Sequence, residues 1–191
     1  ELAEGRSLFR LQKFALAAPH LRRVMGAAHD RDAEVETIAG VLLGPALVEL
    51  GDLDEAETVF ADVIRLCERT GDRLHFGAAH ANRTWLWSKR GEVEQNANDL
   101  RIVIQVAREN GQASVERIGT YNLAEDRLWQ GALDEALQLA RRSLAIQRGH
   151  GEGDDNLDLV LLARVLAAKG DREELATILA LLAGLAQPDQ G

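Results

Sequence analysis

Apolar residues recur along most of the chain at spacings of three and four positions, which places them on one face of a helix. In residues 53–70, for example, Val59, Val63 and Cys67 share a face, and charged residues occupy much of the opposite one. The same pattern predicts helices over residues 33–50, 74–90, 93–110, 115–130, 133–148, 157–169 and 172–186, and a helical pair within residues 1–28. The chain is therefore predicted to be all-α.

A short motif separates these helices at a nearly constant period. Gly51, Gly91, Gly131 and Gly170 each follow a helical run and stand 40, 40 and 39 residues apart; an acidic residue comes next in three of the copies, and Ala132 comes next after Gly131. We expect each glycine to end a helix in the left-handed conformation and the acidic residue to cap the next helix. In the first unit Gln12 stands in place of the corner glycine. A fixed period of this length is typical of solenoids.

The register predicts a right-handed solenoid of about five helical hairpins that form one array over residues 1–186. Its units cover about 1–30, 33–72, 74–111, 115–149 and 157–186. The glycine-rich stretch 149–156 is expected to be the most flexible linker, and residues 187–191 are expected to form a disordered tail. Because the chain starts at Glu1 rather than at methionine, we expect it to be part of a longer protein.

Composition narrows the classes of partner. The net charge of −9 opposes direct binding to nucleic acid or to an anionic membrane surface. No apolar run approaches the roughly 18–20 residues needed to cross a bilayer, and the single cysteine, Cys67, excludes an internal disulfide. Cys67 lies in an apolar helical stripe and is predicted to be a buried core residue. A cytoplasmic location is the expectation.

No pattern of residues indicates catalysis, a cofactor site or a metal site. The five histidines contain no pair at the i, i+4 spacing that places two imidazoles on one helix face. Gly149, Gly151 and Gly153 lack the strand and the Lys-Ser or Lys-Thr pair of a phosphate loop. The paired carboxylates at residues 54–55, 134–135 and 173–174 each begin a helix, where the helix dipole explains them. We therefore expect the chain not to be an enzyme.

The aligned copies resemble the tetratricopeptide repeat (TPR) family over essentially the whole chain. That family places small residues where the two helices of a unit approach closely, and the matching positions here are Gly5, Gly44, Thr84, Ala124 and Ala163, with a second small residue after the corner at Ala17, Ala56 and Ala136. Asn96 stands at this second position in the third unit. The period exceeds the usual one of about 34 residues, and it resembles the long repeats in regulatory arms of bacterial transcription activators and signalling ATPases.

The resemblance implies a concave groove, lined by the first helix of each unit, that binds a protein segment. By register, the residues predicted to line the groove are Asn82, Trp85, Ser88, Lys89, Tyr121, Asn122, Glu125, Trp129 and Arg164. Trp87 falls at a packing position and is assigned to the core. The two asparagines resemble the clamp that holds a peptide carboxylate in some members, but Ala78 and Ile118 stand where that clamp has lysines.

Two classes of function stay open. The leading one is a non-catalytic interaction module, which serves as the regulatory or sensor arm of a larger bacterial signalling or transcription-regulating protein. The alternative is an accessory repeat domain of a multidomain kinase, cyclase or ATPase, or a domain that senses a small effector. The same array serves either class, so the sequence does not separate them.

The last predicted helix is apolar nearly all round, and no polar-faced capping helix follows it. Its large residues are Leu175, Ile178, Leu179, Leu181, Leu182 and Leu185. Solenoids usually end in a helix with a polar outer face. We therefore expect further repeats or, for the isolated chain, a homodimer that forms through this helix.

Overall fold

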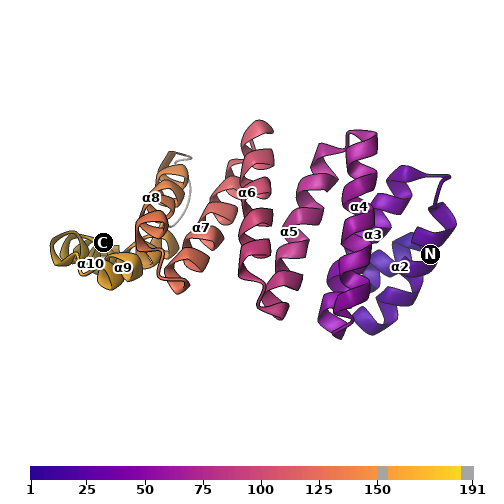
Figure 1. Ribbon diagram of the computed structural model, residues 1–191, viewed down its shortest axis with the longest axis horizontal. Coiled ribbons are helices and arrows are strands. Elements are labelled where there is room, and N and C mark those ends of the chain that lie inside the picture. Colours follow the sequence, from indigo (N-terminus) through magenta and orange to yellow (C-terminus); the bar gives the residue numbers. More distant parts are fainter. Residues whose placement is uncertain (150–154, 186–191) are drawn as a thin grey trace, which may run out of the picture. The chain divides into compact units, whose positions relative to one another are not determined.

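The structure is a computed structural model that describes residues 1–149 and 155–185, and it shows ten helices and no strand in this part of the chain (Figure 1). The helices are α1 (Leu2–Arg10), α2 (Phe14–Ala28), α3 (Ala33–Leu50), α4 (Leu53–Thr70), α5 (Arg73–Arg90), α6 (Val93–Glu109), α7 (Ala113–Trp129), α8 (Leu133–Gly149), α9 (Asn156–Lys169) and α10 (Arg172–Leu185). Taken in order, they make the five hairpins expected from the sequence, so the all-α fold class is confirmed.

The chain divides into two compact units, Glu1–Val106 (unit 1) and Ala107–Gly191 (unit 2), each described here by itself. Within unit 1, α3 contacts not only α2 and α4 but also α1 and α5, and within unit 2, α7 contacts both α8 and α9. Such contacts between alternate helices are what stacked hairpins produce. The single array over 1–186 stays a prediction. The tail 187–191 and most of the linker 149–156 lie outside the described residues.

The corners between helices have the backbone conformation that the glycines require. Gly51 has a φ of +84°, the Asp52 N–H donates to the Leu47 carbonyl at 2.9 Å, and the Gly51 N–H donates to Val48. This pair of bonds satisfies the last carbonyls of α3. Gln12 takes the same conformation, with φ of +56°. The first corner therefore keeps the geometry of the others although its residue carries a Cβ, which disfavours a positive φ.

The capping prediction is only partly correct. The Asp171 carboxylate accepts a hydrogen bond from the Glu174 N–H at 3.2 Å, as expected of a cap. The Asp52 side chain, in contrast, makes no capping hydrogen bond to α4. The prediction is wrong at this corner because the backbone of Asp52, with φ of −81° and ψ of 58°, is not in the extended conformation that caps usually adopt. The Asp32 backbone is extended, and its carboxylate does cap α3 at Val35.

Each unit has its own apolar core, and small residues set the distance between its helices. A Cβ on Gly44 of α3 would lie 2.5 Å from the Phe60 ring of α4, so only glycine fits there without displacing that ring. Phe60 is fully buried in the core of unit 1. In unit 2, Ala124 and Ala136 are buried where α7 meets α8. The small-residue positions expected from the repeat therefore pack as predicted at these hairpins.

Candidate functional site

Five of the predicted groove residues lie in unit 2. Tyr121, Asn122, Glu125 and Trp129 belong to α7, and Arg164 belongs to α9. Positions on α7 have equivalents on α9 that stand 39 residues later, as Ala124 and Ala163 do. The equivalent pairs on the shared face are Ile118 with Leu157, Tyr121 with Val160, Glu125 with Arg164, and Trp129 with Ala168. We call these residues the α7/α9 face.

Charged groups on the α7/α9 face are paired with one another. The Arg164 guanidinium lies 2.5 Å from the Glu125 carboxylate, and its Cζ lies 5.6 Å from the centre of the Trp129 ring. The structure therefore brings three of the predicted residues into contact. A guanidinium above an indole face is attracted by the negative potential of the ring. Arg164 of α9 thus contacts both Glu125 and Trp129 of α7.

A second ion pair fixes α9 against α7 and α8. Asp158 of α9 is fully buried, and its carboxylate accepts a hydrogen bond from Arg117 Nη1 at 2.8 Å and another from the Ser143 hydroxyl. The sequence did not single out Arg117 or Ser143. The burial of Asp158 depends on tertiary packing, so the sequence did not predict it. The carboxylate is part of the core and is not available to a ligand.

Tyr121 lies between the core of unit 2 and the surface. Its ring is half-buried against the core residues of the unit. Burial, together with the negative charge of Glu125, raises the pKa of the Tyr121 phenol above its usual value. The hydroxyl therefore stays neutral near pH 7 and is able to donate a hydrogen bond to a ligand.

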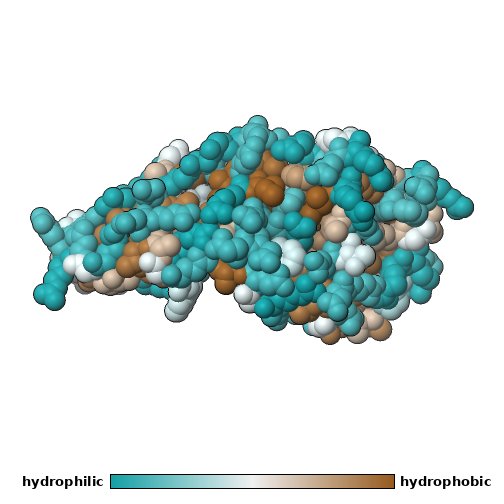
Figure 2. All heavy atoms as spheres, viewed as in Figure 1, coloured by the Kyte–Doolittle hydropathy of each residue, from teal (hydrophilic) through white to brown (hydrophobic). Residues whose placement is uncertain are grey.

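Large apolar side chains are exposed around these pairs. The exposed fractions are 77% for Trp129, 65% for Leu157, 51% for Ile118 and 43% for Val160. All four lie on the α7/α9 face, whereas Tyr121 is the only other large apolar residue of that face and is half-buried. Figure 2, which shows one face of the molecule, likewise shows hydrophobic residues at the surface in patches among hydrophilic ones. Exposure of several large apolar residues on one face makes that face a candidate for an interaction surface.

The predicted groove residues of unit 1 behave differently. Trp85 of α5 is half exposed, and Lys89 is exposed. The Asn82 amide, however, donates to the Val41 carbonyl of α3 at 3.1 Å, and the Ser88 hydroxyl donates to the Thr84 carbonyl of its own helix. The Asn82 amide nitrogen therefore ties two helices together. Its assignment to a binding surface stays a prediction.

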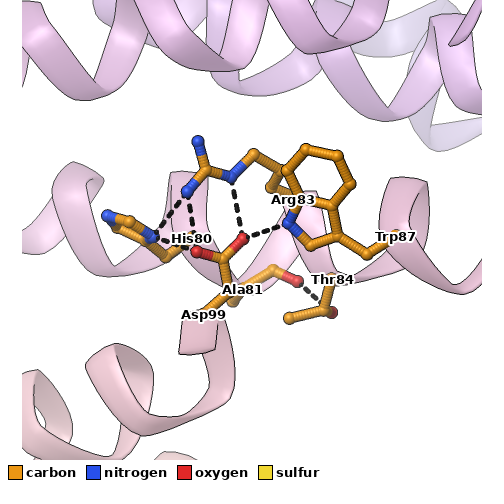
Figure 3. A network of polar contacts seen from close by, with 6 residues as sticks. All are labelled: His80, Ala81, Arg83, Thr84, Trp87 and Asp99. Atoms are coloured by element: carbon orange, nitrogen blue, oxygen red, sulfur yellow. Dashed lines mark hydrogen bonds and ion pairs between the residues drawn. The ribbon is translucent and has the colours of Figure 1, made fainter. Parts of the chain in front are cut away.

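A buried polar network that the sequence did not reveal lies inside the third hairpin (Figure 3). Asp99 of α6 is almost completely buried and accepts hydrogen bonds from three side chains of α5. Arg83 donates two bonds, both of 2.7 Å, Trp87 Nε1 donates one of 2.7 Å, and His80 Nδ1 lies 2.7 Å away. Trp87 is buried, as predicted, but it also supplies a polar contact.

The carboxylate of this network is held in its charged form. Burial by itself raises the pKa of Asp99, but the hydrogen bonds from Arg83 and His80 outweigh it and hold the pKa below its usual value. The Arg83 guanidinium also lies 5.4 Å from the centre of the Trp87 ring. The equivalent positions of the fourth hairpin include two further buried polar residues, Thr120 and Arg127, so the pattern of residue types did not single this network out.

Within the described residues, no group of three or more His, Cys, Asp or Glu side chains is placed to hold a metal ion. Cys67 is buried, as predicted, and burial together with the charge of Asp72 raises its pKa to about 11, so the thiol is unreactive near pH 7. None of the helices in the same part of the chain is long and apolar enough to cross a membrane.

No protein-family model matches the chain, and no curated protein matches it in sequence. Solved structures do resemble it. The nearly identical TPR-like repeats of a kinesin-light-chain-related protein from Podosopora anserina match with a TM-score of 0.80 at 17% identity, covering 100% of this chain and 95% of that one. BtubC (BKLC) from P. vanneervenii matches with a TM-score of 0.81 at 15% identity, covering 98% of this chain and 80% of that one. The chain therefore has the TPR-like repeat fold.

Proposed function

We propose that this chain is a non-catalytic protein-interaction module that binds a partner segment on the α7/α9 face. The observation that carries the proposal is the exposure of Ile118, Trp129, Leu157 and Val160 on one face of two neighbouring helices. Interfaces concentrate their binding energy in a few aromatic anchors. Trp129 has the size and exposure of such an anchor, and Tyr121 adds a neutral hydroxyl on the same face.

The biological context follows the same proposal. The chain serves as the sensor or regulatory arm of a larger bacterial signalling or transcription-regulating protein and works in the cytoplasm, without direct contact to nucleic acid or membrane. The long repeat period and the net charge of −9 support this context. The competing assignments are an accessory domain of a kinase, cyclase or ATPase and a domain that senses a small effector. The reading frame upstream of Glu1 distinguishes the accessory domain from the proposed interaction module, because it would encode the catalytic domain.

The test of binding uses a random-peptide library displayed on phage, selected on the full chain. Trp129→Ala is expected to weaken binding of the selected peptides by at least about 2 kcal/mol, because truncation of a central aromatic anchor has this effect. Tyr121→Ala is expected to act in the same direction. Leu16→Ala is the matched control, since Leu16 is also exposed but lies on α2 in unit 1. Equal binding by all variants, or a library that yields no binder, contradicts the proposal.

We also propose that the isolated chain forms a homodimer through α10. Ile178 packs into the core of unit 2, but Leu179 and Leu181 are exposed, and no charged residue occurs from 175 to 185. The exposed side of α10 is therefore an uncharged apolar helix face. A second copy presents the same face, as a two-fold interface requires.

Light scattering at micromolar concentration tests the dimer. The chain is expected to have the mass of a dimer, and Leu181→Glu is expected to convert it to a monomer because two carboxylates would be buried at the two-fold contact. Leu16→Glu is the control that introduces the same charge elsewhere. A monomeric mass for the unmodified chain overturns this proposal.

A further inference from the structure

The α7/α9 face combines exposed apolar side chains with charges that neutralise one another. Arg164 of this face is held by Glu125, and Arg117, which precedes Ile118 and is not itself part of the face, is held by the buried Asp158. The two pairs contribute two positive and two negative charges, so their formal sum is zero. Charges that are held in such pairs attract a charged partner less strongly than single charges would.

A charged ligand would meet an additional cost at this face. A carboxylate that approached Arg164 would compete with Glu125, and an ammonium group that approached Glu125 would compete with Arg164, which already lies over the Trp129 ring. Ile118 and Leu157 occupy equivalent positions nearer the start of their helices, and both are exposed. Contact with apolar groups of a ligand would remove these side chains from water and stabilise the complex, whereas contact with charged groups would not.

We infer that the segment bound by the α7/α9 face is an uncharged peptide stretch that carries large aliphatic or aromatic side chains, and that it binds with little dependence on salt. The inference rests on the proposed function, because it names the chemistry of the partner at that same face. Ile118 and Leu157 contact the apolar side chains of the segment, Trp129 packs against one of them, and the Glu125–Arg164 pair repels no part of a neutral chain.

The experiment begins with peptides selected from the random library on the full chain. The selected peptides are expected to be rich in Leu, Ile, Phe and Trp and poor in charged residues. Their affinity, measured by fluorescence anisotropy, is expected to change by less than about twofold between about 0.05 and 0.5 M salt, because salt screens charges and not apolar contacts. Ile118→Glu and Leu157→Glu are each expected to reduce the affinity at least tenfold, whereas Leu16→Glu leaves it unchanged.

Removing one charge of the Glu125–Arg164 pair gives a more specific test of the partner's chemistry. Glu125→Gln removes the partner of Arg164, and this variant is expected to bind an acidic derivative of the selected peptide about twofold to fivefold more tightly than the unmodified chain does. Its affinity for that derivative is expected to fall as salt is raised. Arg164→Gln is the matched control of opposite charge and is expected to favour a basic derivative instead.

Different outcomes overturn the two proposals. Peptides whose binding is lost in Ile118→Glu and Leu157→Glu, but which are charged and salt-sensitive, overturn the inference about partner chemistry and leave the proposed function in place. Peptides whose binding survives both substitutions place the interaction elsewhere and overturn the proposed function itself. Circular dichroism and thermal unfolding of each variant show that it is folded, so that lost binding reports on the face.

Discussion

The third and fifth hairpins place different kinds of side chain at four equivalent positions, a polar network in one and aliphatic residues in the other. In the third hairpin these are His80, Arg83, Trp87 and Asp99. The residues that stand 79 positions later, in the fifth hairpin, are Leu159, Leu162, Leu166 and Ile178, all of which are buried. One repeat geometry therefore accommodates either a closed polar network or an apolar core.

The polar network and the apolar core differ in how strictly they fix the packing of their helices. An apolar core gains stability from burial and tolerates exchanges between residues of similar volume. A buried carboxylate is stabilised only when each of its partners is in place, and replacing such a network by apolar residues often leaves a protein equally or more stable. The third hairpin therefore fixes the register of α5 against α6 through specific bonds, whereas the fifth hairpin relies on volume.

The largest expected effect comes from removing the centre of the polar network. Asp99→Ile places the residue of the fifth hairpin into the third and leaves the buried His80 and the partly buried Arg83 without their carboxylate, which is expected to cost about 3–5 kcal/mol. Urea unfolding and hydrogen exchange of the α5 and α6 amides measure it. Ile178→Val at the equivalent position is the control, with an expected cost of about 0.5–1.5 kcal/mol. A cost for Asp99→Ile no larger than that of the control would contradict this account.

Converting the whole network to apolar residues is expected to have the opposite effect on stability from Asp99→Ile alone. The combination His80→Leu, Arg83→Leu, Trp87→Leu and Asp99→Ile gives the third hairpin the four residues of the fifth. It is expected to equal or exceed the stability of the unmodified chain, by up to about 4 kcal/mol, because no charge stays buried. Thermal unfolding compares it with Asp99→Ile. If the combined variant is no more stable than the single one, the unpaired partners are not the source of the loss.

A smaller effect is expected from one hydrogen bond of the network. Trp87→Phe keeps an aromatic ring in the core but removes the N–H that donates to Asp99. The expected cost is about 1.5–3 kcal/mol, the contribution of a hydrogen bond to a charged group. Leu166→Ile, at the equivalent position of the fifth hairpin, is expected to cost less than about 1.5 kcal/mol. Chemical denaturation of both variants decides whether the indole N–H or only the ring volume matters.

The smallest effect concerns pH. The folded-state pKa of Asp99 lies below its unfolded value, so its contribution to stability is present above the unfolded pKa, about 3.9, and is lost as the pH falls through the folded value. Unfolding curves recorded from about pH 6 downward are expected to show the unmodified chain losing more stability than the fully apolar variant. Parallel losses in the two proteins would show that other carboxylates account for the acid sensitivity.

The fold was predictable because its signals are local and repeated. Corner glycines at a constant period mark helix ends whatever the core contains, and Gly51 has the positive φ that this position requires. Even Gln12 was located by register alone. The cap at Asp52 was not predictable in the same way, because capping depends on a backbone angle that the residue type does not determine.

The candidate site was predictable only in part. Register placed Trp129, Glu125 and Arg164 on facing helices, but it did not indicate that Arg164 contacts both of the others. Single polar residues such as Asp99 resemble surface positions in a sequence, since partners on another helix are what make their burial tolerable. The amide of Asn82 shows the opposite case, because a residue typical of a binding surface donates to a neighbouring helix.

The different surroundings of the three tryptophans have an optical consequence. Trp87 is 7% exposed and sits beside a carboxylate and a guanidinium, whereas Trp85 and Trp129 are 44% and 77% exposed. Their emission should therefore separate, with Trp87 at the blue edge of the spectrum and the other two at the red edge. Opening of the third hairpin shifts the blue component, and occupation of the α7/α9 face shifts the red one. The chain thus carries its own fluorescent reporters, one for internal loosening and one for association, without any added dye.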